Sequence, residues 1–381
     1  MTPSQQALRT STALTARVVR DDVELGRMAE DWEELYARSS AATPFQSYAW
    51  ISSWWRAYGT PGRLRLAVVR RAGRLVAVAP LMLRRRALVP VGGGLSDFTD
   101  ILLDDDDAPG TALALRGALL GEPGWDLIDF PEVRPGAAVG RLLPRWGGGS
   151  WRLPASVCLQ LPGMPVDRLL DELGGRTAGK LRRGLRKLDA MDIQMTRVTA
   201  ADADRAMADL IGLHAKQWEN RGINEEHLRP RFARHLTGAA RLLIEQERAM
   251  LTEYRIGGRL VVSDFALVGH DFVGGYLYGA HPDLRAELDI LTLLLRGNLD
   301  LTHRIGRPTL SLLRGSEPHK VKWGPEEVRN QRLILGRGLP AAGYVAGARA
   351  RLAAGRLLSD HFPHLAGHRL RQSIRKVISW R

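Results

Sequence analysis

The sequence predicts an α+β or α/β protein of two lobes, each a mixed, twisted sheet flanked by helices. The chain has 381 residues, 45% of them hydrophobic, which is more than one typical domain and enough for a core in each lobe. Some segments alternate apolar and polar residues, and others repeat apolar residues at helical spacing. Both halves show the order helix–helix–β-hairpin–strand–helix–strand, which indicates a structural duplication.

In the first half, residues 1–16 are polar and small and are expected to form a disordered leader. The pattern that follows predicts a helix carrying Leu25 to Leu35, a helix at 45–59, a hairpin at 64–83, a Gly-rich turn and strand at 91–104, a helix at 111–121 and a strand at 125–133. The hairpin is expected to turn at its Arg-Ala-Gly segment.

The second half predicts the same kinds of element. They are helices at 176–191 and 202–222, three strands within 249–282 that turn at Gly257-Gly258 and His270-Asp271, a helix at 287–306, a strand at 309–315 and a last strand at 332–337. The strand–helix–strand crossover at 273–315 should be right-handed and place two strands in parallel. A ligand is then expected at the carboxyl ends of those strands.

These elements predict four parts of the chain: a disordered leader at 1–16, an N-terminal lobe at 17–165, a C-terminal lobe at 166–338 and a basic helical tail at 339–381. The tail ends in RLRQSIRKVISWR, whose apolar and basic residues favour different helical faces. It is expected either to dock on its lobe with a solvated basic face or to lie on an anionic membrane surface.

The formal net charge is +14. Either genome composition accounts for this excess of arginine, or the protein meets an anionic partner such as CoA, a nucleotide-linked substrate, tRNA or anionic lipid. The single Cys158 lies in an apolar stretch and cannot form an intrachain disulfide. Because no apolar run of about 18 residues and no secretory signal are found, a cytoplasmic protein is expected.

Four segments carry a resemblance to a known family. PFQSYAWISSWWRAYG (44–59), LVAVAPLMLRR (75–85), LHAKQWENRG (213–222) and LLRGSEPHKVKWG (312–324) occur in the order found in cellulose-biosynthesis-type acetyltransferases of the GNAT superfamily. This group resembles the Fem-type peptidyltransferases. The resemblance covers roughly residues 40–335 and implies tandem GNAT-like lobes, with a splayed sheet that admits the pantetheine arm of an acyl-CoA.

The sequence departs from the pattern of this family at three places. His319 stands where the family commonly has an aromatic residue, and Ser311 where it has an acidic one. The segment HPDLRAELDILT (281–292) contains no glycine, whereas ordinary GNAT enzymes bind the CoA pyrophosphate on a Gly-containing loop that opens a helix. The usual mode of CoA binding is therefore not predicted here.

The charged group after the predicted strand 309–315 is the first candidate site. Arg314 can bind a phosphate or carboxylate with two parallel hydrogen bonds. Lys320 matches a lysine that the Fem-type resemblance places at the reacting region, where it stabilises negative charge. Glu317 is expected to act as general base or to hold Arg314, and His319 has an intrinsic pKa suited to proton transfer. The alternative is an ion pair that closes a surface loop.

Five further residues are predicted to contribute. Trp218 and Arg221 are candidate substrate-binding residues, although Trp218 also continues an apolar stripe and Arg221 also suits a helix C-terminus. Tyr278 is a candidate proton donor to the leaving group and Tyr276 a candidate substrate contact, with packing within the strand as the alternative. Asp97 matches an acidic residue of the family and is a candidate contact to the acceptor.

The expected activity is direct transfer of an acyl group, the acetyl group first of all, from acyl-CoA to the amine of a small molecule or sugar, without a metal ion. A Fem-like transferase that uses aminoacyl-tRNA is one alternative. A non-catalytic protein of envelope or polysaccharide assembly is another. Expected partners are the amine acceptor, with tRNA or a nucleotide-linked substrate and a membrane contact through the tail as further options, but not DNA.

Overall fold

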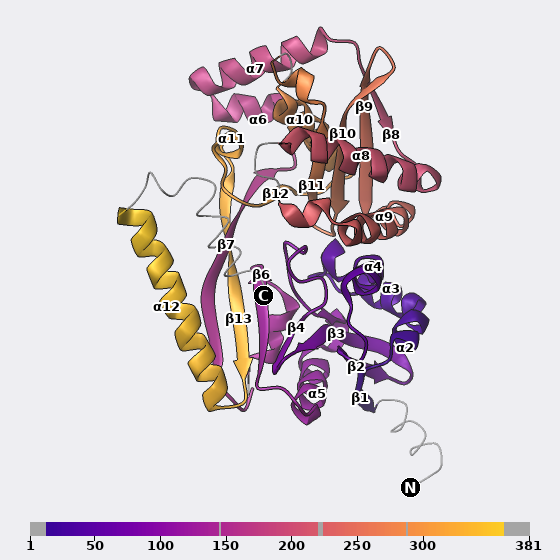
Figure 1. Cartoon of the computed structure of the whole chain (residues 1–381), viewed down its shortest axis with the longest axis vertical. Coiled ribbons are helices and arrows are strands. Elements are labelled where there is room, and N and C mark those ends of the chain that lie inside the picture. Colours follow the sequence, from indigo (N-terminus) through magenta and orange to yellow (C-terminus); the bar gives the residue numbers. More distant parts are fainter. Residues whose placement is uncertain (1–12, 145, 220–223, 287–288, 362–381) are drawn as a thin grey trace. The chain divides into compact units, whose positions relative to one another are not determined.

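The computed structural model describes residues 13–144, 146–219, 224–286 and 289–361. It divides into two compact units, which Figure 1 shows with their elements labelled. Unit 1 comprises Met1–Trp55, Gly59–Ala155 and Asn330–Arg381, and unit 2 comprises Arg56–Tyr58 and Ser156–Arg329. Each unit is a mixed sheet flanked by helices, and the predicted fold class is thereby confirmed. No helix among the described residues is long and apolar enough to span a membrane.

The sheet of unit 1 has the strand order β1-β2-β3-β4-β6-β13, with β5 paired to β3. Its strands are β1 (Leu14–Val19), β2 (Leu64–Arg71), β3 (Arg74–Arg84), β4 (Ala87–Pro90), β5 (Leu102–Leu103), β6 (Leu127–Val133) and β13 (Glu326–Gly336). Its helices are α2 (Asp22–Arg27), α3 (Ala29–Ala37), α4 (Tyr48–Tyr58), α5 (Ala108–Gly121) and α12 (Leu339–His361), with short 3-10 turns η1 (Pro44–Gln46), η2 (Asp105–Asp107) and η3 (Ala138–Leu142).

The sheet of unit 2 has the order β7-β12-β11-β10-β9-β8. Its strands are β7 (Ser150–Pro162), β8 (Ile193–Arg197), β9 (Ala249–Ile256), β10 (Arg259–Val268), β11 (Phe272–Ala280) and β12 (Thr309–Arg314). Its helices are α6 (Val166–Leu173), α7 (Gly175–Asp189), α8 (Ala203–Trp218), α9 (Pro230–Glu245), α10 (Ile290–Arg304) and α11 (Pro318–Val321), with 3-10 turns η4 (Ala200–Asp202), η5 (Glu225–Leu228) and η6 (Pro282–Ala286).

The two units repeat one arrangement of strands. In each, an antiparallel hairpin is followed by a third antiparallel strand, a crossover helix and a parallel fourth strand: β2-β3-β4-α5-β6 in unit 1 and β9-β10-β11-α10-β12 in unit 2. The first hairpin turns at Ala72-Gly73 and the second at Gly257-Gly258, and all four residues have positive φ. Such two-residue turns match the twist of the strands they join, which is why the sequence predicts both hairpins.

The strand that completes each sheet comes from the far side of the chain. β7 follows the elements of unit 1, yet its residues Cys158–Pro162 pair antiparallel with β12 in unit 2. β13 follows the elements of unit 2, yet Gln331–Gly336 pair antiparallel with β6 in unit 1. Each sheet therefore gains a partner for its parallel fourth strand, which would otherwise be an open edge. The sequence does not predict this exchange.

Each unit has its own hydrophobic core. In unit 2 the cluster includes Leu170, Leu181, Leu299 and Trp323, so that α6, α7 and α10 cover one face of the sheet. Helices α8 and α9 pack on β9–β11 from the other side, and α8 approaches β11 most closely. In unit 1, α5 packs on β1–β3. A smaller cluster that includes Ile334 and Val345 seats α12 against β13.

Several elements differ from the sequence prediction. β1 begins at Leu14, within the segment expected to be a leader. Of the strand expected within 91–104, only Leu102–Leu103 pairs. The elements β4, β7, α6, β8 and α9 were not predicted. β4 and β8 are short and give a weak signal, whereas α9 has an apolar face at helical spacing that sequence reasoning overlooked. The tail beyond His361 lies outside the described residues.

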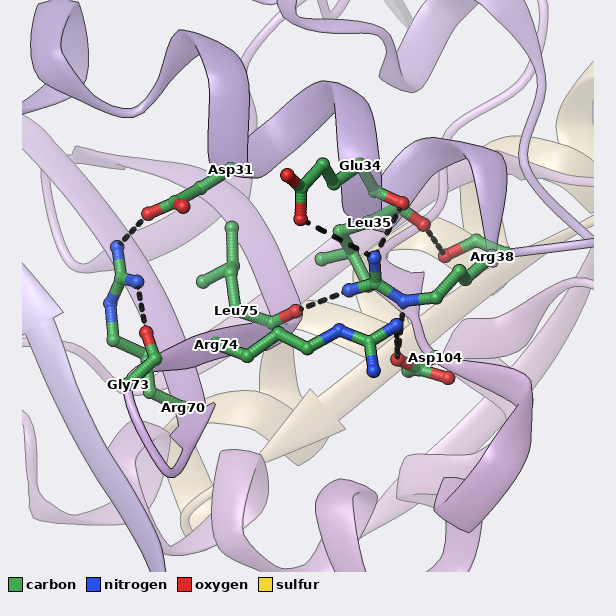
Figure 2. A network of polar contacts seen from close by, with 10 residues as sticks. Asp31, Glu34, Leu35, Arg38, Arg70, Gly73, Arg74, Leu75 and Asp104 are labelled. Atoms are coloured by element: carbon green, nitrogen blue, oxygen red, sulfur yellow. Dashed lines mark hydrogen bonds and ion pairs between the residues drawn. The ribbon is translucent and has the colours of Figure 1, made fainter.

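An ion-pair network in unit 1 involves the acidic run at residues 104–107 (Figure 2). Asp104 is buried, and Arg38 donates to its carboxylate at 2.8 Å. Arg38 also donates to the carbonyl oxygen of Leu75 at 2.9 Å, so α3 is tied to β3. Farther along, Asp107 accepts from the backbone N–H of Gly110 and caps α5. The run therefore fixes two helices.

Candidate active site in unit 2

The candidate site lies where the parallel strands β11 and β12 stop pairing. Their register covers Phe272–Gly274 against Thr309–Ser311, although both strands continue beyond it. β12 is irregular at this level, since its register with β7 shifts between Ser311 and Arg314 and Leu313 has a φ of 53°. β11 is irregular too, because its register with β10 shifts and leaves Tyr276 as an extra residue. Bulges re-aim a strand, and here they separate the carboxyl ends of β11 and β12.

Lys320 closes the loop that follows β12. Its Nζ atom donates to the carbonyl oxygens of Leu312 at 3.0 Å and Arg314 at 3.3 Å, and it lies 3.0 Å from the carboxylate of Glu317. The side chain of Lys320 is only 18% exposed. The ammonium group thus satisfies carbonyl oxygens on both sides of Leu313, whose φ is positive. Lys320 and Glu317 form an ion pair that closes the loop after β12, while the catalytic roles of the predicted residues stay predictions.

The charges of this loop give Glu317 and His319, the two predicted bases, different protonation states. Burial alone would raise the pKa of Glu317, but the Lys320 ammonium more than offsets this and the pKa is lowered. Burial lowers the pKa of His319, and the nearby carboxylate of Glu317 partly opposes that change. Glu317 is therefore ionised and neutralises Lys320, whereas His319 is neutral at pH 7; its residue is exposed overall although its ring is partly desolvated. Of the two, His319 has the intrinsic pKa nearer to neutrality.

The N-terminus of α10 is occupied by a carboxylate of the chain itself. Asp289 accepts from the backbone N–H of Thr292 at 3.3 Å and from its hydroxyl at 2.8 Å, and Lys322 donates to the same carboxylate at 3.0 Å. Burial would raise the pKa of Asp289, but Lys322 and Thr292 lower it. Helix N-termini attract anions, and at this helix the favourable position is already filled.

Helix α8 contributes polar side chains to β11. Gly279 allows the close approach, since a Cβ atom there would lie 2.5 Å from the backbone nitrogen of His214. The Nδ1 atom of His214 lies 2.7 Å from the carbonyl oxygen of Tyr278, and the amide oxygen of Gln217 accepts from the N–H of Ala280 at 3.2 Å. Backbone groups of β11 beyond its pairing with β12 are therefore satisfied by α8.

His214 also pairs with a second histidine, His227 of η5, at 3.1 Å. Burial lowers the pKa of both rings, that of His227 to about 4. A carbonyl oxygen only accepts, so Nδ1 of the neutral His214 carries the hydrogen and its Nε2 accepts from Nδ1–H of His227. His227 stacks on Phe232 with ring centroids 4.4 Å apart. A pKa this low makes His227 a poor proton acceptor at pH 7. The pair of histidines therefore holds the backbone carbonyl of Tyr278 rather than transferring a proton.

The remaining predicted residues are distributed as follows. Tyr276 and Tyr278 are half-buried on β11, and Tyr276 makes an edge-on contact with Phe265. Trp218 ends α8 with its ring centroid 6.4 Å from that of His214. Asp97 belongs to unit 1 and is not among the residues that unit 2 brings together. Arg221 lies outside the described residues.

Sequence reasoning missed His214, Gln217 and Asp289. The first two stand three residues apart on a helix and so face one way, a signal available within the LHAKQW segment. Asp289 precedes the first helical residue Ile290, which is the ordinary position of a capping residue. Among the described residues, no group of three or more His, Cys, Asp or Glu is arranged to hold a metal ion.

Comparison with known proteins concerns the fold and the class of domain. Residues 175–321 match the acetyltransferase (GNAT) domain, a range that contains β9–β12, α10 and the Lys320 loop. No match was found among curated proteins. Several solved structures have a similar fold, and three of them follow.

FemX has a TM-score of 0.57 at 11% identity, over 83% of this chain and 98% of that one. The C-terminal domain of a putative lysylphosphatidylglycerol synthetase from Agrobacterium fabrum has a TM-score of 0.53 at 13% identity, over 86% and 97% of the two chains. L-PGS from Bacillus licheniformis has a TM-score of 0.52 at 12% identity, over 82% and 94%. At these identities the likeness shows the fold, which is GNAT-like as the sequence predicts.

Proposed function

We propose that unit 2 is an N-acyltransferase that moves an acyl group directly to an amine at the point where β11 and β12 part. The observation that carries this proposal is the position of Lys320, held at the carboxyl end of β12 by the backbone carbonyls of Leu312 and Arg314. The match of residues 175–321 to the acetyltransferase (GNAT) domain supports the same reaction class.

Each residue of the loop receives a role from its chemistry. His319 removes the proton from the acceptor amine, because the residue is exposed and its ring is neutral. Lys320 stabilises the oxyanion of the tetrahedral intermediate, and Glu317 holds the ammonium group in place until the reactants arrive. The hydroxyl of Tyr278 protonates the leaving group, while Arg314 and Trp218 bind substrate. The amine then carries the acyl group and the thiol leaves.

The proposed donor is acyl-CoA, with acetyl-CoA first, and the proposed acceptor is the amine of a small molecule or sugar. The support is the GNAT match together with the resemblance of four segments to cellulose-biosynthesis-type acetyltransferases. Because Asp289 and Lys322 fill the N-terminus of α10, the pyrophosphate of the donor is held elsewhere, and basic residues of the chain are available for that contact.

A second candidate is a transferase that uses aminoacyl-tRNA. The filled helix terminus and the backbone groups of β11 taken by His214 and Gln217 favour it, since both positions are unsuited to a CoA arm. One of the structures with a similar fold is FemX, which by its name is a Fem-type protein. The net charge of +14 would favour binding of a nucleic acid. A non-catalytic role in envelope assembly has no such support in the geometry.

A thermal-shift panel separates these donors, because a ligand that binds the folded state raises the melting temperature. The full-length protein is heated with acetyl-CoA, a long-chain acyl-CoA, CoA alone, charged tRNA and uncharged tRNA. A shift with acyl-CoA that grows with concentration supports the first candidate, and a shift specific to charged tRNA supports the second. No shift with any donor, together with no transfer to amines, contradicts both.

A further inference from the structure

A cavity lies in unit 1 and is lined by none of the candidate residues of unit 2. It has a volume of about 550 Å³ and is lined by the β3–β4 turn, by β6 and β13, and by one face of α12. This volume is in the range of pockets that hold small organic ligands. Five arginines and two aspartates contribute to its lining, so positive charge is in excess.

The floor of the cavity is a fixed polar network. Arg332 donates to the buried carboxylate of Asp129 at 2.8 and 2.5 Å, and the hydroxyl of Tyr344 on α12 donates to the same carboxylate at 2.8 Å. Nearby, Arg86 and Asp126 form a second two-point pair. Both aspartates are therefore neutralised within the protein, and neither competes for the remaining arginines.

Two exposed arginines of the lining, Arg85 and Arg351, have no hydrogen bond or ion pair within the described residues. Arg85 occupies the β3–β4 turn with a φ of 55°, a conformation that L-residues other than Asn and Asp rarely adopt. A glycine adopts this conformation without strain, as Gly73, Gly257 and Gly258 do in the turns of the two long hairpins. Arg85 thus combines a strained backbone with an exposed side chain that lines the cavity, which is a reason to ask what its guanidinium group binds.

The apolar part of the cavity lining indicates what the rest of the ligand is. Apolar side chains, among them Leu127, Ala348 and Leu352, line the cavity beside the arginines. Guanidinium groups bind phosphate oxygens with two parallel hydrogen bonds, and two of them suit a group with two negative charges. An inorganic anion would leave the apolar walls unfilled, whereas an organic phosphate uses both features.

We infer that unit 1 binds an organic phosphate in this cavity, with Arg85 and Arg351 as ligands of the phosphate and the apolar walls against its organic part. The phosphate belongs either to a soluble nucleotide or to the headgroup of a phospholipid, because both present the same chemistry. Neither source depends on acyl transfer in unit 2, so this inference stands or falls apart from the proposed function.

The test is binding by the full-length protein at 50 and 150 mM salt. Calorimetry uses ADP and pyrophosphate, and pelleting uses vesicles of phosphatidylcholine with and without phosphatidylglycerol. The variants are Arg85→Gly, which also relieves the turn, and Arg351→Ala. The matched control is Arg349→Ala, which removes the same charge from an exposed position of the same helix that does not line the cavity.

Binding of ADP is expected to weaken at least tenfold in Arg85→Gly and Arg351→Ala and to remain within twofold of wild type in Arg349→Ala. The melting temperature should stay at the wild-type value in Arg351→Ala and Arg349→Ala and should not fall in Arg85→Gly, whose turn is relieved. ADP should bind more tightly than pyrophosphate because the walls contribute. The same pattern with phosphatidylglycerol vesicles alone assigns the phospholipid source and equally supports the inference. Absence of binding to every probe, or equal weakening in Arg349→Ala, overturns it.

Discussion

The carboxylate of Asp289 lies 3.0 Å from the ammonium nitrogen of Lys322 and caps the first turn of α10. The N-terminus of α10, the helix that connects the two parallel strands of unit 2, therefore carries a neutral ion pair where an anion would otherwise bind. A donor with a pyrophosphate group must use other contacts. This relationship makes the position of the donor testable.

Asp289→Asn should leave the KM for acetyl-CoA within about threefold of wild type. The amide oxygen of asparagine can still accept from Thr292 and cap the helix, so the change removes charge and little else. A steady-state titration with acetyl-CoA measures the effect, and Asp283→Asn, at an exposed residue, is the control. A KM at least tenfold lower would mean that the pyrophosphate does bind at this terminus and that Asp289 opposes it.

Protonation of His227 should destabilise the protein in acid. Its folded-state pKa is lowered to about 4, by burial first and then by His214, so the unfolded chain binds the proton more tightly. The stability that this residue contributes is present above pH 6.5 and is lost as pH falls towards 4, by 2–3 kcal/mol at most on the order-of-magnitude scale of 1.4 kcal/mol per pKa unit.

The measurement is denaturant unfolding between pH 7 and pH 4 of wild type and His227→Asn, whose amide can donate to His214 in place of Nδ1–H. Comparing the two proteins isolates His227 from Glu226 and from buried carboxyls that titrate in the same range. The variant should lose less stability than wild type over this interval. Parallel curves would show that His227 is not buried as a neutral ring.

Asp264 should act in the opposite direction. Burial raises its pKa to about 7, although Asn298 donates to its carboxylate at 2.8 Å. The folded protein therefore holds this proton more tightly than the unfolded chain, and the stability that it contributes is lost as pH rises through 7. Asp264→Asn should raise the melting temperature at pH 8.5, where the ionised carboxylate costs up to about 4 kcal/mol, and should change it little at pH 5. An equal effect at both pH values would contradict this assignment.

The network of Figure 2 should be essential to unit 1. Arg38→Met leaves the buried carboxylate of Asp104 without its close partner, which typically costs about 3–5 kcal/mol. Arg74→Met is the matched control, because Arg74 is 51% exposed and lies 4.0 Å from the same carboxylate. Its loss should be within about 0.5 kcal/mol. Denaturant unfolding of both variants measures the difference in the free energy of unfolding. Equal losses in the two variants would show that Arg38 is not the main partner of the Asp104 carboxylate.

Local chemistry explains which parts of the fold could be predicted. The hairpins follow from Gly73 and from Gly257-Gly258, which supply the positive φ that their turns require, and α10 follows from its apolar stripe. The exchange of β7 and β13 could not be predicted. Pairing between strands so distant in sequence depends on which edge is left open after the rest of each sheet has formed.

The site divides in the same way. The group Arg314–Lys320 could be predicted because charged residues directly follow a strand that ends in the sheet. The contacts of Lys320 could not, since they depend on the local backbone around Leu313, whose φ is 53°, and one ammonium group there reaches the carbonyl oxygens of both neighbours. The approach of α8 to β11 likewise depends on the absence of a side chain at Gly279, a tertiary effect that gives no periodic signal.

Turnover of Lys320→Met tests the central claim most directly. An acetyl-CoA or aminoacyl-tRNA transfer assay, with the donor chosen by the thermal-shift panel, compares wild type, Lys320→Met and Lys216→Met, the last at an exposed residue of α8. We predict that kcat falls at least 100-fold in Lys320→Met while the protein remains folded and Lys216→Met keeps wild-type kcat. A folded Lys320→Met protein with wild-type kcat would contradict the account.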